Sequence, residues 1–160
     1  MPERAEFHVS RAGACDFAGL KQVLQETYVE TWLPNLTAEA ASAYEAADKS
    51  GAYVDQRGLE FLVAKLGDEV LGLVDFDGNF VNALHVRPSS ARGGIGSRLM
   101  DRAETEIRKA GFSTARLETD TFNLDSQAFY KAREYQEIDR YPDEEWGSGF
   151  TTVLLEKRLV

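Results

Sequence analysis

A turn that contains three glycines is the segment of this sequence with the clearest chemical potential. Its residues are Arg92-Gly93-Gly94-Ile95-Gly96, between an apolar run that ends at Val86 and a helical pattern that follows. A turn between a strand and a helix directs several backbone N–H groups toward one point, and the helix dipole adds positive potential there. Glycines keep Cβ atoms out of that space. The turn therefore predicts a phosphate or pyrophosphate site, with an ordinary tight turn as the alternative.

The two common nucleotide-binding motifs do not match this turn. The dinucleotide motif G-x-G-x-x-G requires a third glycine at the position of Leu99. A Walker loop continues from its last glycine with Lys and then Ser or Thr, whereas Gly96 is followed by Ser97-Arg98. The phosphate ligand is therefore expected to belong to another class of compound.

Three further segments, together with the turn, resemble the GNAT superfamily of N-acetyltransferases. They are Leu84-His85-Val86-Arg87-Pro88 before the turn, Leu117-Glu118 after the next helix, and Asn123 followed by Phe129-Tyr130. The order and spacing of these segments carry the resemblance, which covers about residues 60–141.

The resemblance implies a mixed, splayed β-sheet flanked by helices, with acetyl-CoA bound between the strand ending at Val86 and the strand ending near Thr119. The pantetheine arm would pair with the backbone of the first strand, and the pyrophosphate would lie on the turn. The residues that the resemblance assigns to the cosubstrate are Leu84, His85, Val86, Arg92, Gly93, Gly94, Ile95, Gly96, Ser97, Asn123 and Tyr130.

The resemblance also implies direct transfer of the acetyl group to a primary amine. Tyr130 would donate a proton to the departing thiolate, since a phenol has a pKa of about 10, near that of an alkyl thiol. Glu118 stands where family members that acetylate protein N-termini carry a catalytic Glu, and His85 or water is the other candidate for the base. Each of these residues also has a purely structural interpretation. Tyr130 would be a core aromatic residue, Glu118 a surface carboxylate on a strand, and His85 a packed, hydrogen-bonded histidine.

Two positions depart from the family pattern. Ala91 replaces the Gln or Arg that usually precedes Gly94 by three residues, which removes a phosphate contact that Arg92 can replace. Glu134-Tyr135 replaces the usual Gly-Phe after the later helix. Both changes concern affinity for acetyl-CoA rather than the reacting atoms.

No pattern identifies the acceptor, so a protein N-terminus and a small-molecule amine both remain open. Trp32 and Trp146 are candidate walls of its pocket. Asp143, Glu144 and Glu145 would favour a cationic amine if their side chains point inward, and otherwise form a solvated charge run.

A catalytically silent acyl-CoA sensor is the alternative function. Tyr130 favours the enzyme, because a sensor needs no proton donor beside the sulfur. Cys15 lies far from the motifs and is expected to be a buried apolar residue rather than an acyl carrier.

The elements that must position these residues follow the order β-α-α-β-β-β-α-β-α-β-β, an α/β or α+β mixed sheet. The predicted strands cover residues 7–11, 59–66, 70–76, 80–86, 115–119, 135–141 and 150–155. The predicted helices begin after Asp16, Thr37, Gly96 and Asn123, and the second of them runs toward Ser50-Gly51. Hairpin turns join the three strands before the glycine turn, and the strand–helix–strand passage across that turn predicts a parallel pair.

Composition limits the remaining possibilities. The 160 residues, 43% of them hydrophobic, fit a single domain over residues 1–160. A net charge of −9 argues against nucleic acid as a partner. One Cys and two His without metal-ligand spacing predict no metal site. No apolar run predicts a membrane span or a signal segment, so a cytoplasmic protein is expected, and the family resemblance suggests a homodimer.

Overall fold

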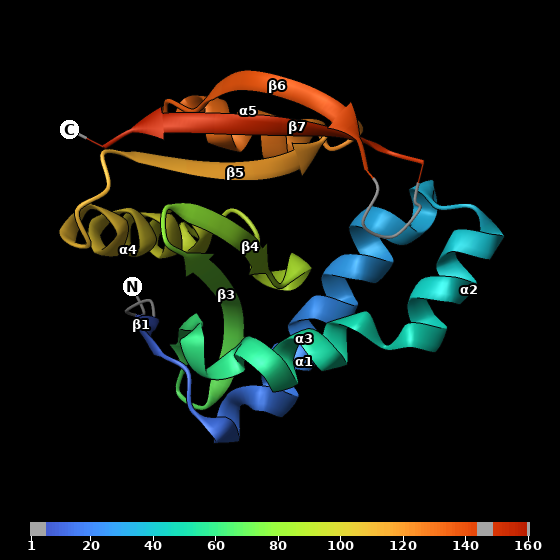
Figure 1. The fold of residues 1–160 in the computed structure, drawn as a ribbon. Coiled ribbons are helices and arrows are strands. Elements are labelled where there is room, and N and C mark those ends of the chain that lie inside the picture. Colours follow the sequence, from blue (N-terminus) through green and yellow to red (C-terminus); the bar gives the residue numbers. More distant parts are fainter. Residues whose placement is uncertain (1–5, 144–148, 160) are drawn as a thin grey trace.

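A seven-stranded mixed sheet in the order β1-β2-β3-β4-β5-β7-β6 forms the centre of the computed structural model, which describes residues 6–143 and 149–159 (Figure 1). Its strands are β1 (His8–Arg11), β2 (Leu62–Leu66), β3 (Glu69–Asp77), β4 (Phe80–Val86), β5 (Thr114–Asp120), β6 (Gln136–Pro142) and β7 (Thr151–Arg158). Only the β4–β5 pair is parallel. The predicted mixed sheet, its hairpins and its parallel pair are confirmed.

Five α-helices accompany this sheet in the described ranges. They are α1 (Phe17–Thr27), α2 (Ala38–Ala47), α3 (Lys49–Arg57), α4 (Ile95–Lys109) and α5 (Leu124–Ala132). A π-helical turn (Tyr28–Trp32) and a 3-10 turn (Leu33–Asn35) extend α1. No helix among the described residues is long and apolar enough to cross a membrane.

The helices cover the two faces of the sheet because the apolar strands alternate in period two. In β2, Leu62 and Ala64 pack into the core beneath α4, whereas Val63 packs into a second core beneath α1 and α3. Aliphatic side chains make up most of both cores, and Tyr130 and Tyr135 belong to the first core. Because both faces of the sheet are buried, the strands before the glycine turn contain nearly continuous runs of hydrophobic residues.

The sheet splays at its parallel pair. Strand β4 pairs with β5 only through Phe80↔Arg116 and Val81↔Leu117, although both strands continue beyond these positions. The later part of β4 therefore has a backbone edge that β5 does not pair. Figure 1 shows β5, β7 and β6 diverging from β3 and β4 as one separate group of strands.

The helix predicted to run from Thr37 toward Ser50-Gly51 is wrong in its second half. Thr37 does cap α2, accepting a hydrogen bond from the Ala40 N–H, but α2 ends at Ala47. Asp48 has a left-handed backbone with φ 46°, and a new helix, α3, begins at Lys49. Aspartate enters this conformation more readily than most residues. Ser50 and Gly51 therefore lie inside α3 instead of ending a helix.

Candidate active site

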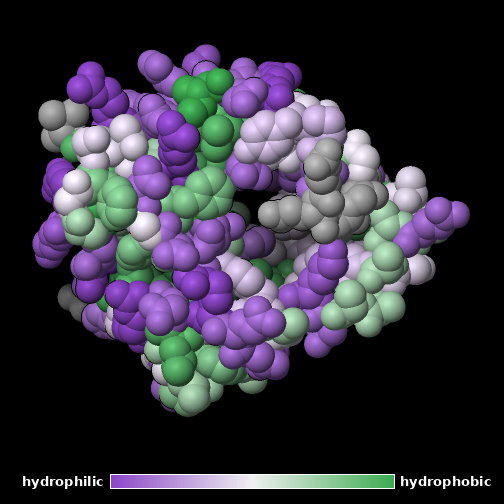
Figure 2. All heavy atoms as spheres, viewed as in Figure 1, coloured by the Kyte–Doolittle hydropathy of each residue, from purple (hydrophilic) through white to green (hydrophobic). Residues whose placement is uncertain are grey.

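Two cavities meet where the sheet splays. One has a volume of about 880 Å³ and the other of about 430 Å³, and both are within the usual range for small-molecule sites. Figure 2 shows this face of the molecule hollowed between the β5–β7 side and the α2–α3 side. The residues that border both cavities are Trp32, Asn82, Ala83, His85, Glu118, Thr119 and Asp120.

The larger cavity contains the glycine turn and nearly all residues predicted to bind the cosubstrate. Those that line it are Leu84, His85, Val86, Arg92, Gly94, Ile95, Gly96, Ser97, Asn123 and Tyr130. Gly93 is within the turn but does not line the cavity. The fold therefore brings together segments that are separated by up to 46 residues of sequence, from Leu84 to Tyr130.

The turn presents unpaired N–H groups to this cavity. Helix α4 begins at Ile95, and its first intrahelical hydrogen bond runs from the Arg98 N–H to the Gly94 carbonyl at 3.1 Å. The N–H groups of Ile95, Gly96 and Ser97 therefore have no partner within the helix. Gly94 has φ 81°, which favours glycine, and no acidic side chain lies in the first turn of α4. These features suit an anion.

A close approach at Gly72 holds the turn beside the end of β4. A Cβ atom at this position would lie 2.8 Å from the His85 carbonyl oxygen and 3.2 Å from Ile95 Cγ2. The absence of a side chain thus lets the first turn of α4 pack directly onto β3 next to β4.

Most arginines near the turn have partners elsewhere. Arg87 forms ion pairs with Glu26 and Glu69, at 2.7 and 2.9 Å. The Arg98 guanidinium donates to the Phe7 carbonyl and lies over the Phe7 ring. Arg92 is the arginine that borders the larger cavity. The anion-binding potential of the turn therefore comes mainly from its backbone and Arg92.

Asn123 and Tyr130 come from the two ends of α5. The Asn123 side-chain oxygen accepts the Ser126 N–H at 3.1 Å and so caps the helix. Tyr130 is 7% exposed and packs edge to face against Phe129 and Tyr135, and its side chain borders the larger cavity. Burial raises the pKa of the Tyr130 phenol well above its ordinary value. The hydroxyl therefore stays protonated at neutral pH.

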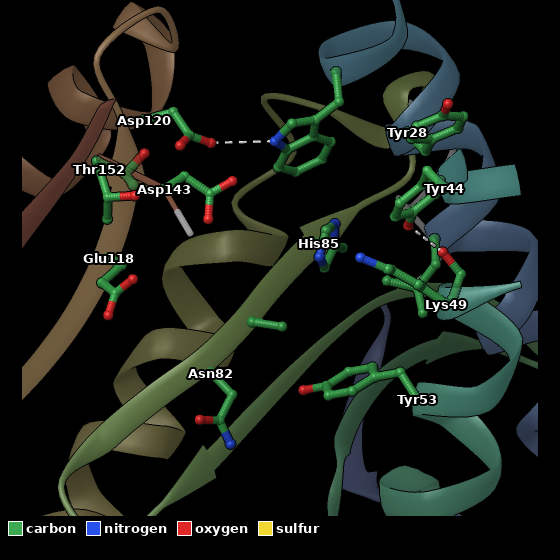
Figure 3. Close-up of a pocket in the computed structure, with 15 residues that line it drawn as sticks. Tyr28, Tyr44, Lys49, Tyr53, Asn82, His85, Glu118, Asp120, Asp143 and Thr152 are labelled. Carbon is green, nitrogen blue, oxygen red and sulfur yellow. Dashed lines mark hydrogen bonds between the residues drawn. The ribbon is translucent and has the colours of Figure 1, made fainter. Parts of the chain in front are cut away.

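The smaller cavity has an aromatic wall and an acidic wall (Figure 3). Tyr28 and Tyr44 stack with their ring centroids 4.3 Å apart on the helical side. Glu118, Asp120 and Asp143 lie on the opposite side, toward β5, as Figure 3 shows. Burial raises the pKa of Asp120, and the charges of Asp143 and Glu118 raise it further.

A hydrogen bond links the two walls. Trp32, on the π-helical turn, donates its indole N–H to Asp120 Oδ2 at 3.2 Å. The Trp32 ring also contacts His85, with centroids 5.5 Å apart. The π-helical turn thus brings Trp32 to the junction of the two cavities, which is consistent with the frequent occurrence of such turns at functional sites.

His85 occupies the centre of this junction (Figure 3). Its side chain points away from Leu84 and Val86, which pack into the core beneath α4, as the strand alternation predicts. Nδ1 lies 2.9 Å from Thr27 Oγ1. Burial lowers the pKa of His85 to about 4, so the imidazole is neutral at pH 7.

A buried ion pair between Arg57 and Asp75 holds α3 in place beside the smaller cavity. Arg57 donates two hydrogen bonds of 2.8 Å to Asp75, which is fully buried, and Asn82 Nδ2 donates a third at 3.1 Å. The Tyr53 hydroxyl, on α3, donates to the same carboxylate. The four groups fix α3 against β3 and β4, where α3 contributes one side of the smaller cavity.

The residues predicted to surround the acceptor lie only partly within the described structure, and the prediction that Cys15 is buried is wrong. Trp32 and Asp143 border the smaller cavity, whereas Glu144, Glu145 and Trp146 lie outside the described residues. Cys15 is exposed, which corrects the expectation of a buried residue: it lies in a short 3-10 turn before α1 and lines neither cavity.

Sequence reasoning missed several residues of this site, notably Thr27, Lys49 and Asp120. For Asp120 a signal was present, because it lies two residues after Glu118 on the same strand and so on the same face. For Thr27 and Lys49 the sequence contains no comparable signal. In the residues that the structure describes, no group of three or more His, Cys, Asp or Glu side chains is placed to hold a metal ion.

Several known proteins are similar to this chain in sequence or in fold. A protein named IAA acetyltransferase from Azospirillum brasilense is 33% identical over 107 residues, which cover 63% of this chain and 69% of that protein. A PaiA N-acetyltransferase from Thermoplasma acidophilum, solved in complex with coenzyme A, has a TM-score of 0.74 at 21% identity, over 96% of this chain and 99% of its own.

A GCN5-related N-acetyltransferase from Rhodopseudomonas palustris has a TM-score of 0.78 at 16% identity, over 99% of both chains. At such identities the structural matches show the fold. The model of the acetyltransferase (GNAT) family matches residues 18–135, a span that includes the glycine turn, Tyr130 and both strands of the parallel pair, β4 and β5. The chain therefore belongs to the acetyltransferase (GNAT) family.

Proposed function

We propose that this protein transfers the acetyl group of acetyl-CoA to a primary amine by direct attack of the amine on the thioester. The observation that carries the proposal is the meeting of the two cavities at His85 and Glu118. One cavity contains a helix N-terminus suited to an anion, and the other has an acidic wall suited to a cation. A donor and an acceptor bound in the two cavities would meet at this junction.

The larger cavity suits coenzyme A in both chemistry and size. The pyrophosphate would accept hydrogen bonds from the N–H groups of the glycine turn, with Arg92 adjacent. The pantetheine amides would pair with the edge of β4 that β5 leaves free beyond Val81. The coenzyme A complex of the Thermoplasma relative supports this assignment through the shared fold.

The reaction forms one C–N bond and breaks one C–S bond. The amine nitrogen loses a proton to a base, and the departing sulfur gains one from an acid. Tyr130 is the proposed acid, because it borders the cavity and its hydroxyl is protonated at neutral pH. Its raised pKa makes it a weaker acid than a free phenol, so the proton would move only after negative charge has developed on the sulfur. Glu118 and His85 both border the junction, where a base would be needed.

Direct transfer needs no acyl-enzyme. The single cysteine, Cys15, borders neither cavity, so a thiol carrier is not available at the junction. The amine would therefore attack the bound thioester itself, and the two substrates would bind together before either product leaves.

The acidic wall favours an acceptor that arrives as a cation. Glu118, Asp120 and Asp143 form this wall, and the stacked Tyr28 and Tyr44 rings add an apolar and aromatic surface opposite it. We therefore expect a primary amine attached to an apolar or aromatic body. IAA also belongs in the acceptor panel, because the Azospirillum relative is named for it.

The test is a panel of acceptors incubated with acetyl-CoA, with release of free coenzyme A thiol and the acetylated product measured together. We expect thiol release that depends on the acceptor, with one acetyl group gained by the product for each thiol. A protein that binds coenzyme A tightly but releases no thiol with any amine or peptide N-terminus would instead be the acyl-CoA sensor.

A further inference from the structure

The Thr27 hydroxyl has one proton and two groups within hydrogen-bond distance, the Leu24 carbonyl oxygen and His85 Nδ1. Thr27 Oγ1 donates to the Leu24 carbonyl oxygen at 3.1 Å, within α1. A carbonyl oxygen can only accept a hydrogen bond, so the hydrogen bond to Leu24 uses the single proton of the hydroxyl. The same Oγ1 lies 2.9 Å from His85 Nδ1. With its proton used in this way, Oγ1 has only lone pairs left for His85, and this arrangement favours Nδ1 as the donor.

The tautomer of His85 follows from this arrangement. A neutral imidazole has one N–H, and the low pKa keeps His85 neutral at pH 7. With the proton on Nδ1, Nε2 has a free lone pair. Within the described residues Nε2 makes no hydrogen bond, and it is not among the buried, unpartnered atoms. It therefore opens onto the cavities that His85 borders.

We propose that Thr27 is a positioning residue that holds His85 as the Nδ1–H tautomer, so that Nε2 is the atom that accepts the proton of the attacking amine. This inference rests on the proposed function, because it assigns the base that the transfer requires. The nitrogen lone pair first forms the C–N bond, and the now acidic proton of this nitrogen passes to Nε2. The C–S bond then breaks, the thiolate takes a proton from the proposed acid Tyr130, and the imidazolium returns its proton to solvent. Throughout, Thr27 Oγ1 keeps accepting from Nδ1.

The location of Thr27 supports a role beyond packing. It is the last residue of α1, immediately before the π-helical turn, and only 7% of it is exposed. From there it joins the helical layer to β4 at the junction of the cavities. A valine would fill the same volume and keep the packing, but it would leave Nδ1–H without an acceptor.

The experiment compares Thr27→Val with Thr27→Ser, which keeps the hydroxyl. The tautomer is measured at pH 7.5 from two-bond ¹H–¹⁵N couplings of the labelled imidazoles. The chain has only two histidines, so a His8→Gln background leaves the His85 signals alone. We expect the proton on Nδ1 in the parent and in Thr27→Ser, and a shift toward the Nε2–H form in Thr27→Val.

Turnover provides the second readout. We expect kcat/KM to fall about tenfold in Thr27→Val, to stay within about threefold in Thr27→Ser, and to fall about 10²-fold or more in His85→Gln. Coenzyme A affinity and thermal stability should change little in either Thr27 variant. A parent with the proton on Nε2 would overturn the inference, as would equal losses in both Thr27 variants.

The two readouts separate this inference from the proposed function. The tautomer is measured without turnover. If no acceptor is acetylated by the parent protein, the proposed function fails whatever the tautomer. If transfer occurs and Thr27→Val leaves both tautomer and kcat/KM unchanged, only the assignment of Thr27 and His85 fails.

Discussion

The Tyr130 hydroxyl lies at the end of α5 in an environment that keeps its proton. Tyr130→Phe retains the ring that packs against Phe129 and Tyr135 and removes only the hydroxyl. If Tyr130 protonates the thiolate, kcat should fall by about 10²–10⁴-fold while coenzyme A affinity and folding stay close to those of the parent. Single-turnover kinetics and calorimetry measure the two quantities separately. A turnover within about threefold of the parent would mark Tyr130 as a core aromatic, and a parallel loss of cofactor binding would mark it as a positioning residue.

His85 should also make stability depend on pH. Its folded pKa of about 4 is below the ordinary value of 6.5, so between these values the unfolded chain binds a proton that the folded protein does not. Proton binding therefore favours the unfolded chain. As the pH is lowered from 6.5 to about 4, the free energy of unfolding should decrease by as much as about 1.4 kcal/mol per pH unit. Above pH 7 His85 should contribute no slope.

The matched comparison is His85→Gln, followed by urea unfolding between pH 4 and pH 8. Lys49, Glu118, Asp120 and Asp143, the other charged groups that border the smaller cavity with His85, are present in both proteins, so the comparison isolates the contribution of His85. The stability of the parent relative to the variant should fall as the pH falls from 6.5. A difference that stays constant across this range would show that His85 titrates alike in the folded and unfolded chains.

At the scale of elements, the glycine turn and the first turn of α4 should act as one anion site. Gly94→Val places a β-branched residue at φ 81°, where the strained backbone must shift immediately before the N–H groups of residues 95–97, and should reduce coenzyme A affinity at least tenfold. Gly67→Val is the control: its φ is 60°, in the β2–β3 hairpin, with nothing within 4 Å. It imposes similar backbone strain far from the cavity. Equal affinity losses in the two folded variants, measured by calorimetry, would show that the effect is not local.

The elements show which part of this site was predictable. The strands before the glycine turn were predicted to within a few residues, because a Gly-Asp pair and an Asp-Gly pair separate their apolar runs. Asn123 was predicted to begin α5 because an N-cap hydrogen bond joins residues only three positions apart, here Asn123 and Ser126. Both signals act over short distances in sequence.

What could not be predicted depends on long-range packing. The break at Asp48 follows no Gly or Pro, and the π-helical turn at Tyr28–Trp32 has no sequence signature. The Thr27–His85 contact joins residues 58 positions apart, and the Trp32–Asp120 contact joins residues 88 apart. Their partners are fixed only when α1 packs across β4. The motifs therefore predicted most residues of the larger cavity, where we propose that acetyl-CoA binds, but not the helical side of the smaller cavity.

At the scale of the whole molecule, the splayed sheet leaves a gap that a ligand can fill. Only two residue pairs join β4 to β5, so the two groups of strands are held together chiefly by the core beneath α4. A ligand that pairs with the free edge of β4 and caps α4 would bind the folded state alone. Such binding must stabilise the fold by mass action.

Coenzyme A should therefore raise the melting temperature. At a concentration about 100 times its Kd, the folded state gains roughly 2.7 kcal/mol, which corresponds to roughly 5–10 °C for a chain of this size. Pantetheine, which has the arm but no pyrophosphate, should give a much smaller shift at equal concentration. Hydrogen exchange should slow most in the β4 residues beyond Val81 and in the turn at residues 92–97, because both would donate hydrogen bonds to the ligand. Stabilisation by coenzyme A with protection confined to α1–α3 would place the cosubstrate in the smaller cavity and reverse the roles of the two cavities.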